Sequence, residues 1–247
     1  MMLQIVSVIA FCVLLSEARI FNVERNRTHH SHHRAHDLPP KAHHRTHHRT
    51  HLPPANETAL VARYIVNHAE WAAIATVSVQ KDTDTYPVAD VVSISDGPIE
   101  NGTGIPYMYI TPLDTTTQNL DKDNRATLLV SLAEKSYCKD KHLDPMDPRC
   151  AKVTLTGIIV PVKDTAELKT VTQSFFGRHP GLQNLPADHH FYFAKLEILN
   201  IDLLDGFGGL KHISVEDYYH PSLNHTVNKL YERAFVSNIV SNIVSNE

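Results

Sequence analysis

The segment HHFYFAKLEILNIDLL (His189–Leu204) is the last strongly apolar stretch of the chain, and it is long enough for one bent strand or a pair of strands. Earlier segments alternate apolar and polar residues with the period of two that is typical of strands. They are Ala73, Ala75, Val77 and Val79; Val88–Ser95; Pro106–Thr111; Leu128, Val130 and Leu132; and Val153 with Leu155, in a strand that can extend to Val162. Six or more strands with few helices, none placed regularly between them, argue against a doubly wound parallel sheet. The predicted fold class is therefore α+β, a mainly antiparallel β-barrel with peripheral helices.

Two amphipathic helices are predicted beside these strands. The first opens the domain, with a stripe at helical spacing made of Leu60, Val61, Tyr64, Ile65, His68 and Trp71. We interpret His68 on this stripe as a core histidine with satisfied hydrogen bonds rather than as a metal ligand. Asp164 and Glu167 form a capping box before the second helix, which carries Leu168, Val171 and Phe175.

Charge and histidine are distributed unevenly along the chain. Its 247 residues carry a net charge of −4, but residues 19–56 alone carry +5 and hold ten of the 18 His, which leaves −9 for the remainder. Such asymmetry is typical of a tail attached to a domain. The tail has few large apolar side chains and is predicted to be disordered. Three interpretations of its histidines stay open: a solvated linker, capture of Zn²⁺ or Cu²⁺, and pH-dependent adhesion to anionic glycans or lipids.

The remaining segments of the chain have distinct compositions. Leu3–Leu15 is an apolar run that is too short to span a bilayer comfortably. The small residues Ser16 and Ala18 follow it. Together these features are the pattern of a secretory signal peptide over residues 1–18. A folded domain is predicted over residues 57–226, and residues 227–247 form a C-terminal extension with a repeated SNIV tetrad. The mature chain is expected to be secreted or endolysosomal, with no transmembrane segment.

Cysteines and glycosylation sequons agree with a secretory route. Cys12 lies in the signal peptide, so Cys138 and Cys150 remain as an even pair and are predicted to form a disulfide, the alternatives being two free thiols or two metal ligands. Four N-x-[ST] sequons are predicted glycosylation sites. They lie at Asn26, Asn56, Asn101 and Asn224, although Asn56 has the alternative role of a helix N-cap.

The sequence contains no motif that makes an enzyme. It lacks H-E-x-x-H, G-x-S-x-G, C-x-x-C and a Walker loop, and the glycines near Phe207 do not complete a dinucleotide fingerprint. The aspartates at positions 90, 96, 114 and 205 are expected to serve in turns or caps rather than in acid–base catalysis. His189 and His190 lack a suitably spaced carboxylate or Cys for metal binding. No catalytic, cofactor-binding or metal-binding residue is therefore assigned.

Several motifs resemble the CREG family of secreted glycoproteins. They occur in the family's order and cover approximately residues 59–219. The quoted segments are PVADVVSISDGP, GIPYMYITPLDTTTQNL, CKDKHLDPMDPRC, FFGRHPG, HFYFAKLEILNIDLLDGFGG and VEDYY. The His-rich tail and the SNIV repeat lie outside the resemblance.

This resemblance implies a split β-barrel like that of the flavin-mononucleotide-binding pyridoxamine-phosphate-oxidase proteins, assembled as a homodimer. In that superfamily flavin lies at the dimer interface, and basic and hydroxyl side chains hold its phosphate. CREG proteins are regarded as having lost the activity, with the equivalent pocket occluded by their own chain. This sequence offers hydroxyls at Ser93, Ser95, Thr111 and Thr115–Thr117 but no Arg or Lys until Lys122, and the Cys138–Cys150 loop is a candidate for the occluding insert.

The resemblance also implies a role in growth and differentiation, through receptors such as the mannose-6-phosphate receptor that bind the glycans. Of the four sequons, Asn224 falls where a family site is expected. The sequence thus predicts a secreted or endolysosomal, non-catalytic homodimer that acts through partners. The alternatives are a flavin- or haem-binding oxidoreductase-like protein and a metal-buffering protein. Nucleic acid is not an expected partner, because the one basic stretch belongs to a secreted tail and the core is acidic.

Overall fold

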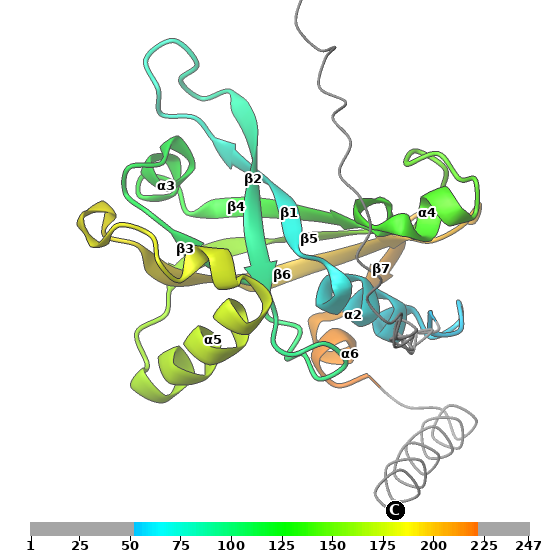
Figure 1. Ribbon diagram of the computed structural model, residues 1–247. Helices are drawn as coiled ribbons and strands as arrows, with labels where there is room; N and C mark the ends of the chain where they lie inside the picture. The colour runs from blue at the N-terminus through cyan, green and yellow to red at the C-terminus, as the bar shows by residue number, and fades with distance from the viewer. Residues whose placement is uncertain (1–51, 222–247) are drawn as a thin grey trace, which may run out of the picture. The chain divides into compact units, whose positions relative to one another are not determined.

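A computed structural model describes residues 52–221, shown in Figure 1. The signal peptide, nearly all of the His-rich tail, the C-terminal extension, and the sequons at Asn26 and Asn224 lie outside the described residues. The tail is predicted to reach residue 56, whereas Leu52 packs against the hydrophobic core and Pro53 is buried. The folded part therefore begins a few residues earlier than predicted, because Leu52 buries apolar surface that the tail composition as a whole does not reveal.

The described chain forms a closed antiparallel barrel, which confirms the predicted fold class of a mainly antiparallel split β-barrel with peripheral helices. Hydrogen-bonded neighbours follow the order β3-β2-β1-β4-β5-β6, and β3 pairs again with β6 to close the barrel, while β7 extends the sheet beyond β6. The strands are β1 (Trp71–Val77), β2 (Pro87–Ser95), β3 (Tyr107–Ile110), β4 (Arg125–Ser131), β5 (Lys152–Pro161), β6 (Tyr192–Leu204) and β7 (Lys211–Ile213).

The last apolar segment forms one bent strand rather than a pair. The first residues of β6 pair with β3, as in Tyr192 opposite Ile110, and the later ones pair with β7, as in Ile201 opposite Ile213. β6 pairs with β5 along its length, and the register shifts beside Gly157. This bulge bends β6 so that one strand belongs both to the barrel and to its extension.

The first strand forms where it is predicted, but the opposite set of side chains faces the core. Ala72, Ile74 and Thr76 are buried, whereas Ala75 is exposed and Ala73 is only half-buried. Both sets are largely apolar, so the contrast that normally identifies the inward face of a strand is missing. The outward set is therefore an apolar surface on the outside of the barrel.

Helices surround the barrel, as predicted. They are α2 (Thr58–His68), α3 (Thr115–Leu120), α4 (Ser136–Asp140), α5 (Thr165–Arg178) and α6 (Val215–Tyr219), with 3₁₀ turns η1 (Leu132–Glu134), η2 (Pro180–Leu182) and η3 (Ala187–His189). The predicted first helix ends before Trp71, which instead begins β1. Figure 1 shows α3 and α4 at opposite ends of the barrel.

The predicted capping box of α5 is only half formed. The Asp164 side chain accepts a hydrogen bond from the Glu167 backbone N–H, as the box requires. The Glu167 carboxylate instead accepts bonds from Lys195 Nζ at 2.8 Å and from the Tyr107 hydroxyl at 2.8 Å. Lys195 and Tyr107 face each other across β6 and β3, so this cluster ties α5 to the seam that closes the barrel.

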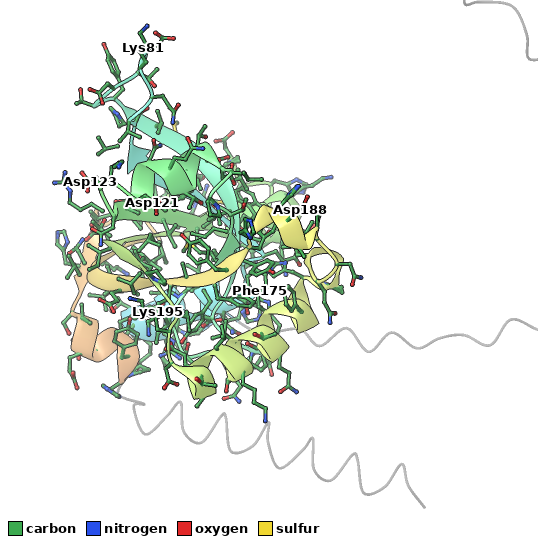
Figure 2. The ribbon with its side chains drawn as sticks, turned by 90° about the vertical axis from the view of Figure 1, so that its left-hand side faces the viewer. Lys81, Asp121, Asp123, Phe175, Asp188 and Lys195 are labelled. Atoms are coloured by element: carbon green, nitrogen blue, oxygen red, sulfur yellow. A yellow bond between two sulfur atoms is a disulfide. The ribbon has the colours of Figure 1, made fainter. Side chains whose placement is uncertain are left out.

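Two apolar clusters hold these layers together. The larger fills the barrel and includes the inner face of α2, while the smaller lies under α5 and is made of Tyr107, Val162, Val171, Phe175 and Phe193. Phe175 is fully buried and contacts the Phe193 ring edge-on, with centroids 5.4 Å apart. Figure 2 shows Phe175 between α5 and the barrel, and Lys81 at the tip of the hairpin that joins β1 to β2. Between residues 52 and 221, no helix reaches the length and apolarity needed to cross a bilayer.

Candidate functional site

The first candidate surface joins β2, the end of β3 and α3, where the hydroxyls expected near a flavin phosphate lie. Three of the six, those of Ser95, Thr111 and Thr116, are engaged within the protein. Ser95 is buried and hydrogen-bonds with Gly97, and the Thr111 hydroxyl donates to the His189 carbonyl. The Thr117 hydroxyl is buried without a partner among the described residues, and Thr115 is exposed.

The Thr116 hydroxyl is bound to a carboxylate rather than to a cation. Thr116 Oγ1 donates to Asp90 Oδ2 at 2.8 Å, which joins α3 to β2. The sequence holds no Lys, Arg or His between Lys81 and Lys122. A flavin phosphate carries negative charge and needs cations or clustered backbone amides. The residues at this surface therefore do not fit the phosphate of the flavin that the fold family implies.

The other candidate aspartates have structural roles. Asp114 is the N-cap residue of α3, and Asp205 pairs with Lys211 at 2.7 Å. These two agree with the expected turn or cap role. Asp90 does not, because it lies within β2 and binds Thr116 across elements.

Asp96 is the most buried of the four and organises a polar cluster. Its carboxylate accepts bonds from Asn67 Nδ2 at 2.7 Å and from the Gly104 N–H at 3.1 Å, and Arg178 Nη1 lies 3.8 Å away. Burial raises the pKa of Asp96, and these hydrogen bonds and the nearby arginines oppose that shift. Arg178 and Arg63 also donate to backbone carbonyls of the same loop, so the cluster fixes the chain between β2 and β3.

The Asn101 sequon lies on this fixed loop. Asn101 is exposed, and the hydroxyl of Thr103, the third sequon residue, donates to the Asp96 carbonyl at 2.9 Å. A Cβ at Gly102 would lie 2.1 Å from Asp96 Oδ2, so only glycine fits between the two polar residues of the sequon. Asn56 is also exposed, and it precedes α2, whose N-cap residue is Glu57. Both described sequon asparagines are therefore accessible at the surface.

The predicted disulfide forms between Cys138 and Cys150. Both residues are buried, and their loop begins in α4. Since α3 and α4 lie at opposite ends of the barrel, the loop does not cover the β2–α3 surface of its own chain (Figure 1). Its suggested role as an occluding insert stays a prediction, because the described residues do not show which pocket it would cover.

Neither candidate histidine site contains a metal-binding group. His68 Nδ1 bonds to the Tyr64 carbonyl at 2.9 Å, while its Nε2 is buried without a partner. Burial is the main reason that the pKa of His68 is lowered. The ring is half-buried and only one of its two nitrogens is hydrogen-bonded, so the prediction of satisfied hydrogen bonds is wrong. His189 and His190 end η3, and within residues 52–221 no three His, Cys, Asp or Glu side chains gather as metal ligands do.

The second candidate surface is the outer face of β1, β2 and β4. In register, Val91, Ala73 and Leu129 form one row across the three strands, and Ala89, Ala75 and Thr127 form the next. Val91 is 64% exposed and Leu129 41% exposed. We call the set Trp71, Ala73, Ala75, Ala89, Val91 and Leu129 the outer apolar face. Sequence reasoning missed it, although the double apolar alternation in Trp71–Val77 is a signal that could have identified it.

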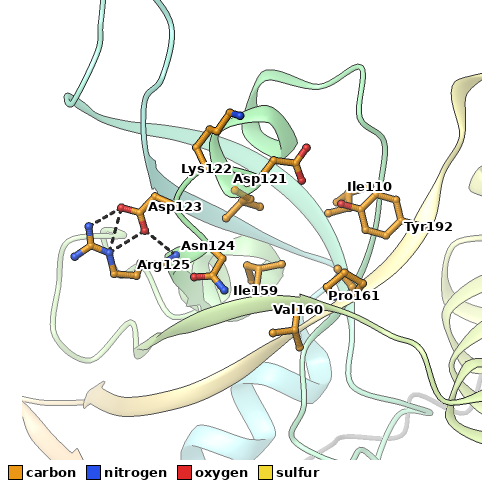
Figure 3. A pocket seen from close by; sticks show the side chains of 12 residues that line it. Ile110, Asp121, Lys122, Asp123, Asn124, Arg125, Ile159, Val160, Pro161 and Tyr192 are labelled. Carbon is orange, nitrogen blue, oxygen red and sulfur yellow. Dashed lines mark hydrogen bonds and ion pairs between the residues drawn. The ribbon is translucent and has the colours of Figure 1, made fainter.

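A third feature that the sequence does not indicate is a pocket of about 550 Å³ at one end of the barrel (Figure 3). It lies between the 121–125 turn after α3 and the strands β3, β5 and β6. Its lining comes from four separate parts of the chain, so only the closed barrel creates it.

Comparison with known proteins places the chain in a family. The model named "CREG, beta-barrel" matches residues 53–220. Protein CREG1 of Homo sapiens is 41% identical over 169 residues, which are 68% of this chain and 76% of that protein. Protein CREG2 of Homo sapiens is 36% identical over 161 residues, which are 65% of this chain and 55% of that protein. Neither relative is named for an enzymatic activity.

A solved heme binding protein from Mycobacterium smegmatis has the same fold, with a TM-score of 0.53 at 19% sequence identity. The match covers 68% of this chain and 61% of that protein. At this identity the similarity shows the fold alone. The family match, the relatives and the closed barrel agree: the chain belongs to the CREG β-barrel family.

Proposed function

We propose that this protein is a secreted or endolysosomal glycoprotein, a non-catalytic split-barrel homodimer that acts through receptor or partner binding in the control of growth and differentiation. The observation that carries the proposal is the buried Cys138–Cys150 disulfide, because such bonds form and persist in oxidising secretory compartments. The exposed Asn101, on a loop held by Asp96, supports glycan display on a rigid surface. A sorting or cell-surface receptor that recognises those glycans is the proposed partner.

The outer apolar face supports the homodimer. Its six residues are contiguous in register and lie on the outside of the barrel. Contiguous exposed apolar patches on soluble proteins mark interaction sites. A second copy meeting this face across a two-fold axis would bury it against itself, as the most common closed oligomers do.

The surface beside Asp90 supports a role without flavin catalysis. A phosphate placed near Thr116 would meet the Asp90 carboxylate, with no cation of this chain between Lys81 and Lys122 to balance it. Asp90 is exposed, so water weakens this repulsion, but its negative charge still disfavours a phosphate at this position.

Glycan analysis of the secreted full chain tests the proposal. Protein collected from the medium or lysosomes of an animal cell line is expected to gain mobility on an SDS gel after enzymatic glycan removal. Asn101→Gln is expected to remove one glycan-dependent mobility step, because Asn101 is exposed and precedes Gly102-Thr103. Asn200→Gln is the matched control, since Asn200 is exposed but lies outside any sequon. Retention in the cytosol, or secreted protein that glycan removal leaves unchanged, would contradict the proposal.

The second candidate function is cofactor binding, with flavin or haem at the dimer interface. The observation that favours it is the fold shared with the heme binding protein from Mycobacterium smegmatis. An absorption spectrum of gently purified dimer distinguishes the two proposals. We expect no flavin band, because the Asp90–Thr116 surface opposes a flavin phosphate. A flavin or Soret band stoichiometric with the dimer would support the second function instead.

A further inference from the structure

The pocket at the end of the barrel has an apolar base and a polar rim. Seven lining residues are apolar or aromatic: Ile110, Leu120, Ile159, Val160, Pro161, Tyr192 and Ala194. The five consecutive residues 121–125 form the opposite side (Figure 3). At about 550 Å³, the pocket is within the range that holds small organic molecules.

Hydrogen bonds hold the rim in place without a ligand. The N–H groups of Lys122 and Asp123 both donate to the Asn119 carbonyl, at 3.0 and 2.9 Å. The Asn124 carbonyl accepts from the Ile159 N–H at 2.8 Å, which joins the turn to β5. On the opposite wall, Tyr192 pairs with Ile110 at the seam that closes the barrel. The pocket is therefore preformed, which lowers the entropic cost of binding.

Two of the four charged rim residues neutralise each other. Arg125 Nε donates to Asp123 Oδ1 at 2.8 Å, and this hydrogen bond lowers the pKa of Asp123 to about 2. The pair is therefore ionised and paired across the physiological pH range. Each of these two side chains therefore already has an opposite charge beside it.

The side chains of the other two charged residues, Asp121 and Lys122, point in different directions relative to the pocket. Neither side chain forms a hydrogen bond or ion pair with the residues that the structure describes. Figure 3 shows the Asp121 carboxylate extending over the pocket toward Tyr192, while the Lys122 side chain extends away from it. Burial, and secondarily the charge of Asp121, raises the pKa of Tyr192, which agrees with their proximity. The unpaired charge that extends over the pocket is therefore the negative charge of Asp121, an exposed residue of the rim.

We propose that this pocket binds a small organic cation with an apolar body, of the aryl-alkyl amine class. The ammonium group pairs with Asp121 and meets the face of the Tyr192 ring, since aromatic rings attract cations. The apolar body covers the side chains of Ile110, Ile159 and Pro161. An anionic ligand of the same shape would meet Asp121 with like charge, and the charge of Arg125 is already balanced by Asp123.

Titration of the full chain with matched probes tests the ligand class. The probes are 2-phenylethylamine and phenylacetate, which share an aromatic body and differ in charge, and the readout is the NMR shift of isoleucine methyl groups. The amine is expected to shift the Ile110 and Ile159 signals saturably, and phenylacetate is expected to bind at least about tenfold more weakly. Asp121→Asn is expected to weaken amine binding about tenfold, the effect of losing one charge-assisted hydrogen bond.

Two control variants distinguish an effect of the charge at Asp121 on amine binding from an effect of the net charge of the protein. Asp188→Asn makes the same change at an exposed position on η3 and is expected to leave amine binding unchanged. Lys122→Gln is expected to leave it unchanged or to strengthen it. Phenylacetate binding as tightly as the amine, binding of neither probe up to its solubility, or an Asp121→Asn variant with unaltered affinity would each overturn the proposal. A folded Asp121→Asn protein is verified by an unchanged methyl spectrum away from the pocket.

Discussion

Replacing Val91 with glutamate is expected to convert the proposed dimer into a monomer. Val91 is 64% exposed and lies in one row with Ala73 and Leu129 on the outer apolar face. In a two-fold dimer over this face, each interface would contain two new carboxylates in an apolar environment without partners. Such burial costs several kcal/mol per charge, which is enough to shift a micromolar equilibrium fully toward the monomer.

Light scattering coupled to size-exclusion chromatography measures this outcome. The wild-type chain is expected at twice the protomer mass and the Val91→Glu variant at the protomer mass, with glycan mass subtracted. The fold is expected to be retained, because the side chain at position 91 points away from the core. Leu199→Glu is the matched control, since Leu199 is 70% exposed but lies at the bulge of β6. A monomeric wild type, or dissociation by Leu199→Glu and not by Val91→Glu, would contradict the proposed interface.

Gly157→Ala is expected to lower the free energy of unfolding by about 3 kcal/mol. This value is the upper end of the usual cost of inserting extra atoms into a well-packed site. A Cβ at this position would lie 2.0 Å from the Glu197 carbonyl oxygen on β6. Because the obstacle is backbone within the bulge, relief requires the β5–β6 register to change. Chemical denaturation followed by circular dichroism measures the change.

Gly177→Ala is the control for this substitution. Gly177 lies in α5, and a Cβ there meets no heavy atom within 4 Å. Alanine is the better helix former by about 1 kcal/mol, so this variant is expected to be stabilised. Equal destabilisation of both variants would show that the bulge does not require glycine.

Much of the fold follows from local pattern. The strands containing Leu128 and Val153, the helix after Asp164, and the disulfide are all where the sequence predicts them. Each rests on a periodicity or a pairing whose signal is contained within a short segment. The inward face of β1 is predicted wrongly because Ala73 and Ile74 belong to two sets that are both apolar.

The candidate sites can be predicted less well than the fold from the residue pattern of short segments. The absence of cations between Lys81 and Lys122 is visible in the sequence, and it already argues against a flavin phosphate. That Asp90 binds Thr116 is not visible, because the two residues lie on separate elements. The location of the Cys138–Cys150 loop, at the end of the barrel opposite α3, is likewise a property of the packed chain (Figure 1).

The sequence by itself predicts that His189–Leu204 contains a strand, that the domain is an antiparallel barrel, and, among three alternatives, that Cys138 and Cys150 pair. Only the tertiary structure decides that this segment is one bent strand, which meets β3 at one end and β7 at the other. The physical reason is that alternation specifies which residues can be buried, whereas closure depends on contacts between distant residues such as Ile110 and Tyr192. The pocket beside Tyr192 exists only once those contacts have formed, and the outer apolar face exists only once β1 has paired with β2 and β4.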